Sequence, residues 1–204
     1  MKRRGARMPD EAVSVEDLRV RRATIEDLDT VVALRLALLR EYPDHPVYGR
    51  LRPDAELRAR TLFAAQLDAV NEVVFIAERR GKAVGLLRCV ETVSSPLLFP
   101  ERYCYVSSAY VRPEHRQRGV LQALVAQVRD WCAERGLTEM RLHNVGARAS
   151  AAAAWDALGF EVVEQVRVLR LDTAAHPARA VDAGRSSARS ASSAGSAGAS
   201  SAIR

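Results

Sequence analysis

A short basic turn, Arg116-Gln117-Arg118-Gly119, holds the residues of this sequence best suited to bind a phosphate group. Apolar residues recur behind it at helical spacing as far as Gly136, so a helix is predicted to begin directly after the turn. The first N–H groups of a helix have no partner inside it, and the helix dipole makes that end positive. The turn is therefore predicted to hold a phosphate group on main-chain N–H groups, with two guanidinium groups beside it. The alternative is an ordinary solvated turn.

The residues before the turn predict a strand that would position it. The run from 103 to 111 is rich in aromatic and β-branched residues and contains neither Gly nor Pro. Pro113 ends the strand because it has no N–H to give to a neighbouring strand. Gly119 allows a backbone conformation or a close approach that a Cβ would obstruct. Strand, tight basic turn and helix are the predicted unit.

This unit resembles the acetyl-CoA-binding motif of the GNAT acyltransferase superfamily, whose core is Arg/Gln-x-x-Gly-x-Gly/Ala. Here the core is Arg116-x-x-Gly119-x-Leu121, preceded by Val111-x-Pro113. Leu121 stands where the family has a small residue. The loop is still expected to bind the pyrophosphate, because its donors are main-chain groups. The larger side chain of Leu121 instead affects how closely the helix packs at this position.

A second motif of the same family follows in the right order. Its pattern is Asn-x-x-Ala-x-x-Phe/Leu-Tyr-x-x-x-Gly-Phe, and Ala151, Gly159 and Phe160 fit it, whereas Arg148 replaces the Asn and Trp155 the Tyr. In many members that Tyr is thought to protonate the CoA thiolate, which an indole N–H cannot do. Either Trp155 only packs beside the pantetheine arm, or water or another donor protonates the thiolate, whose pKa is roughly 8.5. The two motifs cover about residues 103–160, and the opening strand and helix extend the match weakly to residue 18.

The resemblance implies acetyl-CoA as cosubstrate and no metal. Neighbouring parallel strands at 103–111 and 137–144 are expected to splay after Ala109 to Val111, leaving main-chain groups free for the pantetheine and the thioester carbonyl. Asn144 would bond the pantetheine amides; its alternative role is a turn residue. The residues implied for cofactor binding are Ala109, Tyr110, Val111, Arg116, Gln117, Arg118, Gly119, Val120, Leu121, Asn144 and Trp155.

The base that would deprotonate the amine is harder to name. In several branches of the family a Glu or His on the central strand does this, and those positions are here Ser107 and Tyr105, which alternation places on one face with Val111. Neither is a good base, although Tyr105 could relay a proton through water instead of merely packing. The predicted catalytic set is Tyr105, Ser107 and Glu41, with Glu41 favoured for binding a cationic amine. Other candidates, which could equally be solvated surface groups, are Tyr42, Asp44, His45, Glu91 and His143.

Length and patterning predict one domain with tails. The chain has 204 residues, 48% of them hydrophobic, and its predicted element order is βααβββαβαβ. The expected fold class is α/β (α+β), and the resemblance implies a GNAT-type mixed central sheet of about six to seven strands flanked by four helices. The domain is expected at 18–172, between a flexible tail at 1–17 and a disordered Ala/Ser/Gly/Arg tail at 173–204.

Charge and cysteine usage limit the partners. The net charge is +6, but the tails hold eight of the 31 basic residues and five of the 25 acidic ones, so residues 18–172 carry 23 basic against 20 acidic side chains. A nucleic-acid partner is disfavoured because the basic tails lack interleaved aromatic residues. Three widely spaced cysteines in apolar segments, Cys89, Cys104 and Cys132, are expected to be buried thiols. A cytoplasmic protein without a membrane segment or signal peptide is expected, and a homodimer is possible.

The leading hypothesis is an N-acetyltransferase that moves an acetyl group from acetyl-CoA to a primary amine of a small molecule or peptide. The alternative is a CoA-binding regulatory or non-catalytic GNAT domain, favoured by Arg148, Leu121, Trp155 and the missing base. Thiol release from acetyl-CoA in the presence of an amine would separate the two.

Overall fold

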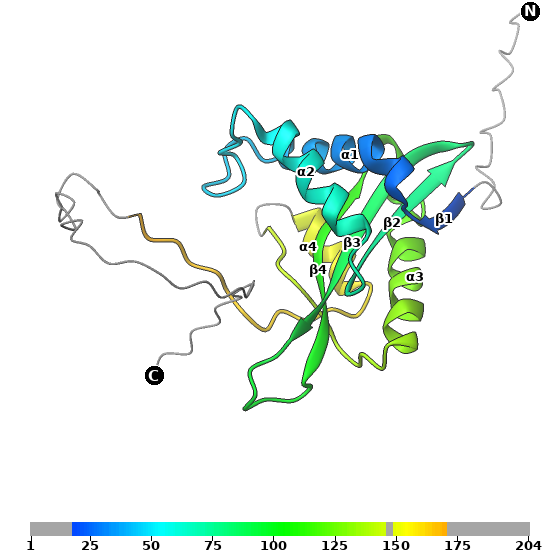
Figure 1. Ribbon diagram of the computed structural model, residues 1–204. Helices are drawn as coiled ribbons and strands as arrows, with labels where there is room; N and C mark the ends of the chain where they lie inside the picture. The colour runs from blue at the N-terminus through cyan, green and yellow to red at the C-terminus, as the bar shows by residue number, and fades with distance from the viewer. Residues whose placement is uncertain (1–17, 146–148, 171–204) are drawn as a thin grey trace, which may run out of the picture. The chain divides into compact units, whose positions relative to one another are not determined.

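The computed structural model describes residues 18–145 and 149–170 (Figure 1). The tails expected at 1–17 and 173–204 and the motif position Arg148 lie outside the described residues. The chain divides into two units, Met1–Ala153 and Ala154–Arg204, and the first holds the sheet.

A five-stranded mixed sheet forms the centre of the first unit. Its strands lie side by side in sequence order, and the first three pairings are antiparallel while the last is parallel. The strands are β1 (Leu18–Arg22), β2 (Glu72–Arg79), β3 (Lys82–Val93), β4 (Arg102–Val111) and β5 (Met140–Leu142). The mixed α/β class is confirmed. The predicted strand count was too high: residues 160–170 form no strand, and β5 is shorter than the run predicted at 137–144.

Local sequence accounts for the antiparallel half. Arg80 and Gly81, between β2 and β3, have φ values of 50° and 72°, as a tight hairpin turn requires. A capping box precedes the first helix: Thr24 N–H donates to Asp27 Oδ2 over 2.9 Å. Arg21 connects β1 to the start of this helix, because it donates hydrogen bonds to both carboxylate oxygens of Asp27. It also donates to Glu78 on β2.

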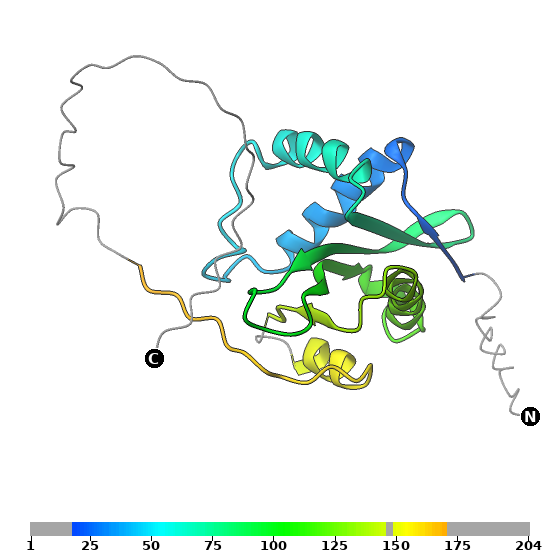
Figure 2. The same cartoon turned by 60° about the horizontal axis from the view of Figure 1, so that its bottom comes forward.

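Helices cover both faces of the sheet (Figure 1, Figure 2). The four α-helices of the described residues are α1 (Leu28–Arg40), α2 (Ala55–Leu67), α3 (Val120–Glu134) and α4 (Ala149–Asp156). Helices α1 and α2 share one apolar core with β2 and β3, and α3 lies on the opposite face of the sheet. The three cysteines are buried, as predicted. None of the helices in the described ranges is long and apolar enough to cross a bilayer.

The sheet opens between β4 and β5. Their parallel register runs only from Cys104↔Met140 to Val106↔Leu142, whereas β4 continues to Val111. The divergence therefore begins after Val106, earlier than the predicted Ala109 to Val111. From there to its end, the outer edge of β4 pairs with no strand of the described residues.

Candidate active site

The basic turn is a left-handed loop directly before α3. Gln117 and Gly119 have φ values of 57° and 78°, and the helix begins at Val120. Positive φ at position 119 explains the glycine there, because a side chain in this region strains the backbone. The turn is thus separate from the helix, as the sequence predicted, and residues 117–119 are exposed.

Main-chain donors of the turn are free. Within the described residues, the N–H groups of Gln117, Arg118 and Gly119 donate to no acceptor. The first bond of α3 runs from Ala123 N–H to Gly119 C=O over 3.0 Å, so the first helical N–H groups are also unused. Successive free donors at the positive end of a 15-residue helix are chemically suited to bind an anion.

Two residues that the motif does not include hold this turn in place. Arg79, at the end of β2, is only 9% exposed and donates from Nη2 to Arg118 C=O over 2.8 Å. Gly85 on β3 allows the first turn of α3 to approach the sheet, since a Cβ there would lie 3.0 Å from Val120 Cγ1. The buried guanidinium of Arg79 therefore bonds the turn to the sheet, and the absence of a side chain at Gly85 lets the start of α3 pack against it.

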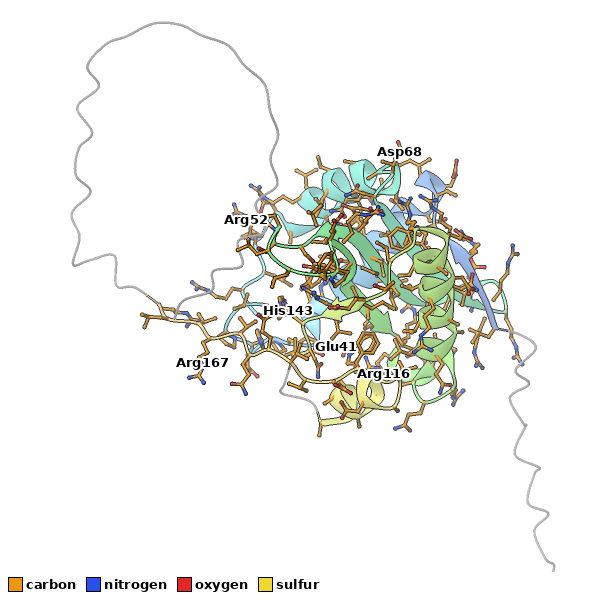
Figure 3. All side chains as sticks on the ribbon, turned by 90° about the horizontal axis from the view of Figure 1, so that it is seen from below. Glu41, Arg52, Asp68, Arg116, His143 and Arg167 are labelled. Atoms are coloured by element: carbon orange, nitrogen blue, oxygen red, sulfur yellow. The ribbon has the colours of Figure 1, made fainter. Side chains whose placement is uncertain are left out.

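The side chain of Arg116 lies away from the free donors. Its Nε donates to Val111 C=O over 2.9 Å, and its Nη2 forms an ion pair with Glu41 at the end of α1 (Figure 3). Of the two guanidinium groups expected beside the diphosphate, only that of Arg118 has no partner among the described residues. Arg116 instead connects the end of β4 to α1.

A bulge in β4 changes which side chains share a face. Arg88 is opposite Ser108 and Cys89 is opposite Val106, so Ser107 is an extra residue in the ladder. Tyr105 and Tyr110 lie opposite Val90 and Leu86 and share the face that α1 covers. The prediction that Tyr105 shares a face with Val111 was wrong, because unbroken alternation cannot anticipate the inserted residue.

Ser107 accepts a hydrogen bond from the Arg88–Glu72 ion pair on this face. Arg88 Nη1 donates to Ser107 Oγ over 2.5 Å, and Arg88 Nη2 lies 2.6 Å from Glu72 Oε2. The side chains of Arg88 and Glu72 are 13% and 14% exposed. Ser107 Oγ, which accepts a bond from a cation, is poorly suited to remove a proton.

Tyr105 and His143 form a hydrogen-bonded pair beside the opening of the sheet. Tyr105 Oη lies 2.9 Å from His143 Nδ1, and the two rings meet edge to face. Burial raises the pKa of Tyr105, and its neighbours Tyr48 and Tyr103 raise it further. The phenol therefore stays protonated at neutral pH and can serve as a relay, with the imidazole as its partner.

The loop between α1 and α2 contributes aromatic residues to the same face. Tyr48 stacks on His45 with ring centroids 4.8 Å apart, and His45 Nδ1 accepts the N–H groups of Val47 and Tyr48. His45 is thereby used to shape the loop. Asp44 is exposed, and Glu91 pairs with Arg102 and Arg135.

The remaining predicted cofactor residues occupy different settings. Asn144 is exposed and lies two residues beyond β5, and Leu121 is half-buried in the first turn of α3. In the second unit, Trp155 packs edge to face on Phe160, whose N–H bonds Trp155 C=O. Gly159, three residues after the end of α4, has a φ of 87°, a left-handed conformation that favours glycine.

Arg35, Tyr48, Glu72, Arg79 and Arg88 were not predicted. No local motif marks them, because they come from four segments that only the fold brings near the turn or the bulge. One available signal was the charge of Arg35 within the apolar run of α1; another was Arg88 in the apolar run of β3.

Comparison with known proteins gives one consistent result. The model of the acetyltransferase (GNAT) family matches residues 34–160. Aminoglycoside N(6')-acetyltransferase type 1 of Salmonella typhimurium is 30% identical over 132 residues, which cover 61% of this chain and 81% of that protein.

Solved structures agree with this match. Aminoglycoside N-acetyltransferase AAC(6')-Iy in complex with CoA is 26% identical, with a TM-score of 0.60 over 76% of this chain and 94% of that one. A predicted acetyltransferase with acetyl-CoA from Clostridium acetobutylicum gives a TM-score of 0.62 over 78% of this chain and 98% of that one. At 18% identity the second likeness concerns the fold alone.

Proposed function

The chain belongs to the acetyltransferase (GNAT) family and is an acyltransferase, and from this premise we propose that it transfers an acetyl group from acetyl-CoA to a primary amine. Relatives named as aminoglycoside N-acetyltransferases act on small-molecule amines, which supports a small molecule over a peptide as acceptor. A regulatory, non-catalytic domain is not favoured.

One observation carries the proposal: the exposed turn with unused N–H groups lies at the end of the strand whose neighbour diverges. A diphosphate bound at 117–121 would direct the pantetheine arm of CoA into the opening between β4 and β5. Main-chain groups on the free edge of β4, from Ser107 to Val111, would bond that arm and the thioester oxygen. Positioning of this kind accounts for much of the rate of acyl transfer.

In the proposed reaction, the neutral amine attacks the thioester carbonyl carbon. The C–N bond forms, the C–S bond breaks and CoA leaves as a thiolate, which takes a proton from water because the indole of Trp155 is no acid. The amine loses its proton to Tyr105 Oη as the phenol proton passes to His143 Nδ1. Ser107 and Glu41 hold other groups in place, Arg88 and Arg116 respectively.

A matched pair of glycine variants tests the turn. Gly119→Asp places a carboxylate where the diphosphate would lie, while aspartate is a favourable residue at a helix N-terminus and tolerates positive φ. Gly136→Asp makes the same change at φ 66° at the other end of α3, where nothing lies within 4 Å of a new Cβ. Calorimetry on the full chain should show acetyl-CoA affinity at least tenfold lower for Gly119→Asp only.

Unchanged affinity in Gly119→Asp would remove the assignment of the turn. Thiol release from acetyl-CoA in the presence of an amine panel tests the chemistry separately. Acetyl-CoA binding without acetylation of any amine would revive the regulatory domain.

A further inference from the structure

Arg35 is a basic residue in the apolar part of α1. Val31, Val32, Leu34 and Leu36 around it are buried, and Arg35 itself is half-buried. It interacts electrostatically with Tyr48, Arg88 and Tyr105. These four side chains, with Glu72 beside Arg88 and His143 beside Tyr105, form the polar cluster beside the bulge. Loss of hydration in this setting lowers the pKa of Arg35 from its ordinary value.

No partner satisfies this guanidinium. Across 18–145 and 149–170, Arg35 forms neither an ion pair nor a hydrogen bond. Its neighbour Arg88, by contrast, is neutralised by Glu72. Together these three residues carry one uncompensated positive charge. Keeping a partly dehydrated cation unpaired costs folding free energy, and a bound anion would recover it.

The carboxylates around the cluster are already occupied. Glu41 pairs with Arg116, and Glu91 pairs with two arginines. Asp44 in the α1–α2 loop is exposed. The half-buried part of the cluster therefore offers an unused cationic group, and no unused anionic one, to a molecule approaching Tyr105.

We propose that the acceptor is an amine that also carries a carboxylate, and that Arg35 binds this carboxylate while the amine faces Tyr105. The inference rests on the proposed acetyl transfer and names the class of its acceptor. A guanidinium binds a carboxylate through two parallel N–H···O bonds, which orients the acceptor as well as attracting it. A single excess positive charge matches a carboxylate, whereas a phosphate group carries about −1.5 to −2 at neutral pH.

This acceptor differs in charge from an aminoglycoside, which carries several ammonium groups and no carboxylate. The positive charges of such a polycation would be repelled by the unpaired Arg35, and this repulsion disfavours an aminoglycoside as the acceptor. Among small-molecule amines, the inference therefore favours one that carries a carboxylate over an aminoglycoside.

The experiment uses the full chain, acetyl-CoA and paired acceptors. The panel contains L-amino acids and dipeptides, the carboxamide of each, and kanamycin as the polycation. Thiol release gives kcat and KM, mass spectrometry identifies the products, and calorimetry measures acetyl-CoA affinity independently. The variants are Arg35→Gln, Arg35→Lys and Arg40→Gln, the last changing an exposed arginine in the final turn of the same helix.

The expected result is a kcat/KM at least tenfold higher for the carboxylate than for its carboxamide in at least one pair. Arg35→Gln should remove this preference through KM, Arg35→Lys should keep part of it, and Arg40→Gln all of it, with acetyl-CoA affinity unchanged throughout. Equal or better use of carboxamides or kanamycin overturns the inference, as does a preference that survives Arg35→Gln. Intact acetyl-CoA binding with no carboxylate-bearing acceptor used also overturns it. Failure to bind acetyl-CoA would instead remove the proposed function and, with it, this inference.

Discussion

The turn before α3 and the polar cluster beside the bulge hold their functional groups in different ways. In the turn the donors are N–H groups of consecutive residues from Gln117 onward, fixed by backbone conformation. In the cluster they are side chains from different segments: Arg35 from α1, Arg88 from β3, and Tyr105 and His143 on either side of the opening. A main-chain site depends on φ and ψ, and a side-chain site depends on the identity of each residue.

This difference predicts opposite responses to substitution. The turn should tolerate changes that preserve its conformation, since the N–H groups remain. The cluster should lose a distinct property with each side chain: proton transfer with Tyr105, recognition of the acceptor with Arg35. Variants that affect cofactor binding and variants that affect acceptor chemistry should therefore fall into separate groups.

The largest effect is expected from the Tyr105–His143 pair. Tyr105→Phe and His143→Gln should each lower kcat about 100-fold, as removal of a proton relay does, and leave acetyl-CoA affinity unchanged. The double variant should be no slower than either single variant, because the pair acts as one unit. Steady-state kinetics across pH would measure this, and additive losses would show that the two residues act separately.

The next largest effect is expected for the stability of the protein when Asp27, at the start of α1, is replaced. Hydrogen bonds from Arg21 lower the pKa of Asp27 from 3.8 to about 2. A lowered pKa means that this stabilisation is complete above about pH 4 and is lost as the pH falls toward 2. Asp27→Asn should lower the free energy of unfolding by about 1–2 kcal/mol at neutral pH, a value reduced for the partial exposure of Arg21.

Urea denaturation of both proteins at several pH values would test this. The difference between them should vanish as the pH falls through the interval from about 4 to about 2. Acetyl-CoA affinity, measured well below the unfolding transition, should be the same in both, because Asp27 bonds Arg21 and Thr24 and no residue of the turn. A difference that persists at low pH would show that Asp27 stabilises the protein by another route.

The two regions also differ in how far sequence alone predicts them. The position of the turn was predicted because its requirements, a glycine at residue 119 and a helix directly behind it, are local, whereas the partners of Arg116 were not. The cluster was predicted only in part. Tyr105 was identified, but its partner was not chosen, and the bulge at Ser107 reversed the expected face of Val111. Arg35 and Arg88 become neighbours only once α1 packs on the sheet.

Arg79 tests whether the turn needs support from the sheet. Arg79→Met fills a similar volume but removes the donor to Arg118 C=O. Acetyl-CoA affinity should fall roughly tenfold, about 1.4 kcal/mol, while the acceptor KM stays the same. Arg22→Met, at an exposed position of β1, is the control. An effect on acceptor KM instead would mean that Arg79 acts on the cluster.

Glu41 is where the two regions meet, and its substitution should have the smallest effect. The sequence favoured Glu41 as the site of a cationic amine, but its carboxylate pairs with Arg116, whose Nε donates to the end of β4. With the arginine side chain 37% exposed, the pair should contribute less than about 1 kcal/mol. Glu41→Gln should therefore raise the KM for acetyl-CoA no more than about fivefold, since about 1 kcal/mol corresponds to roughly that factor. The acceptor KM should not change, because in this geometry Glu41 serves the cofactor side. A rise in acceptor KM alone would instead show that Glu41 leaves Arg116 to bind the ammonium group, and acceptor recognition would then divide between Glu41 and Arg35.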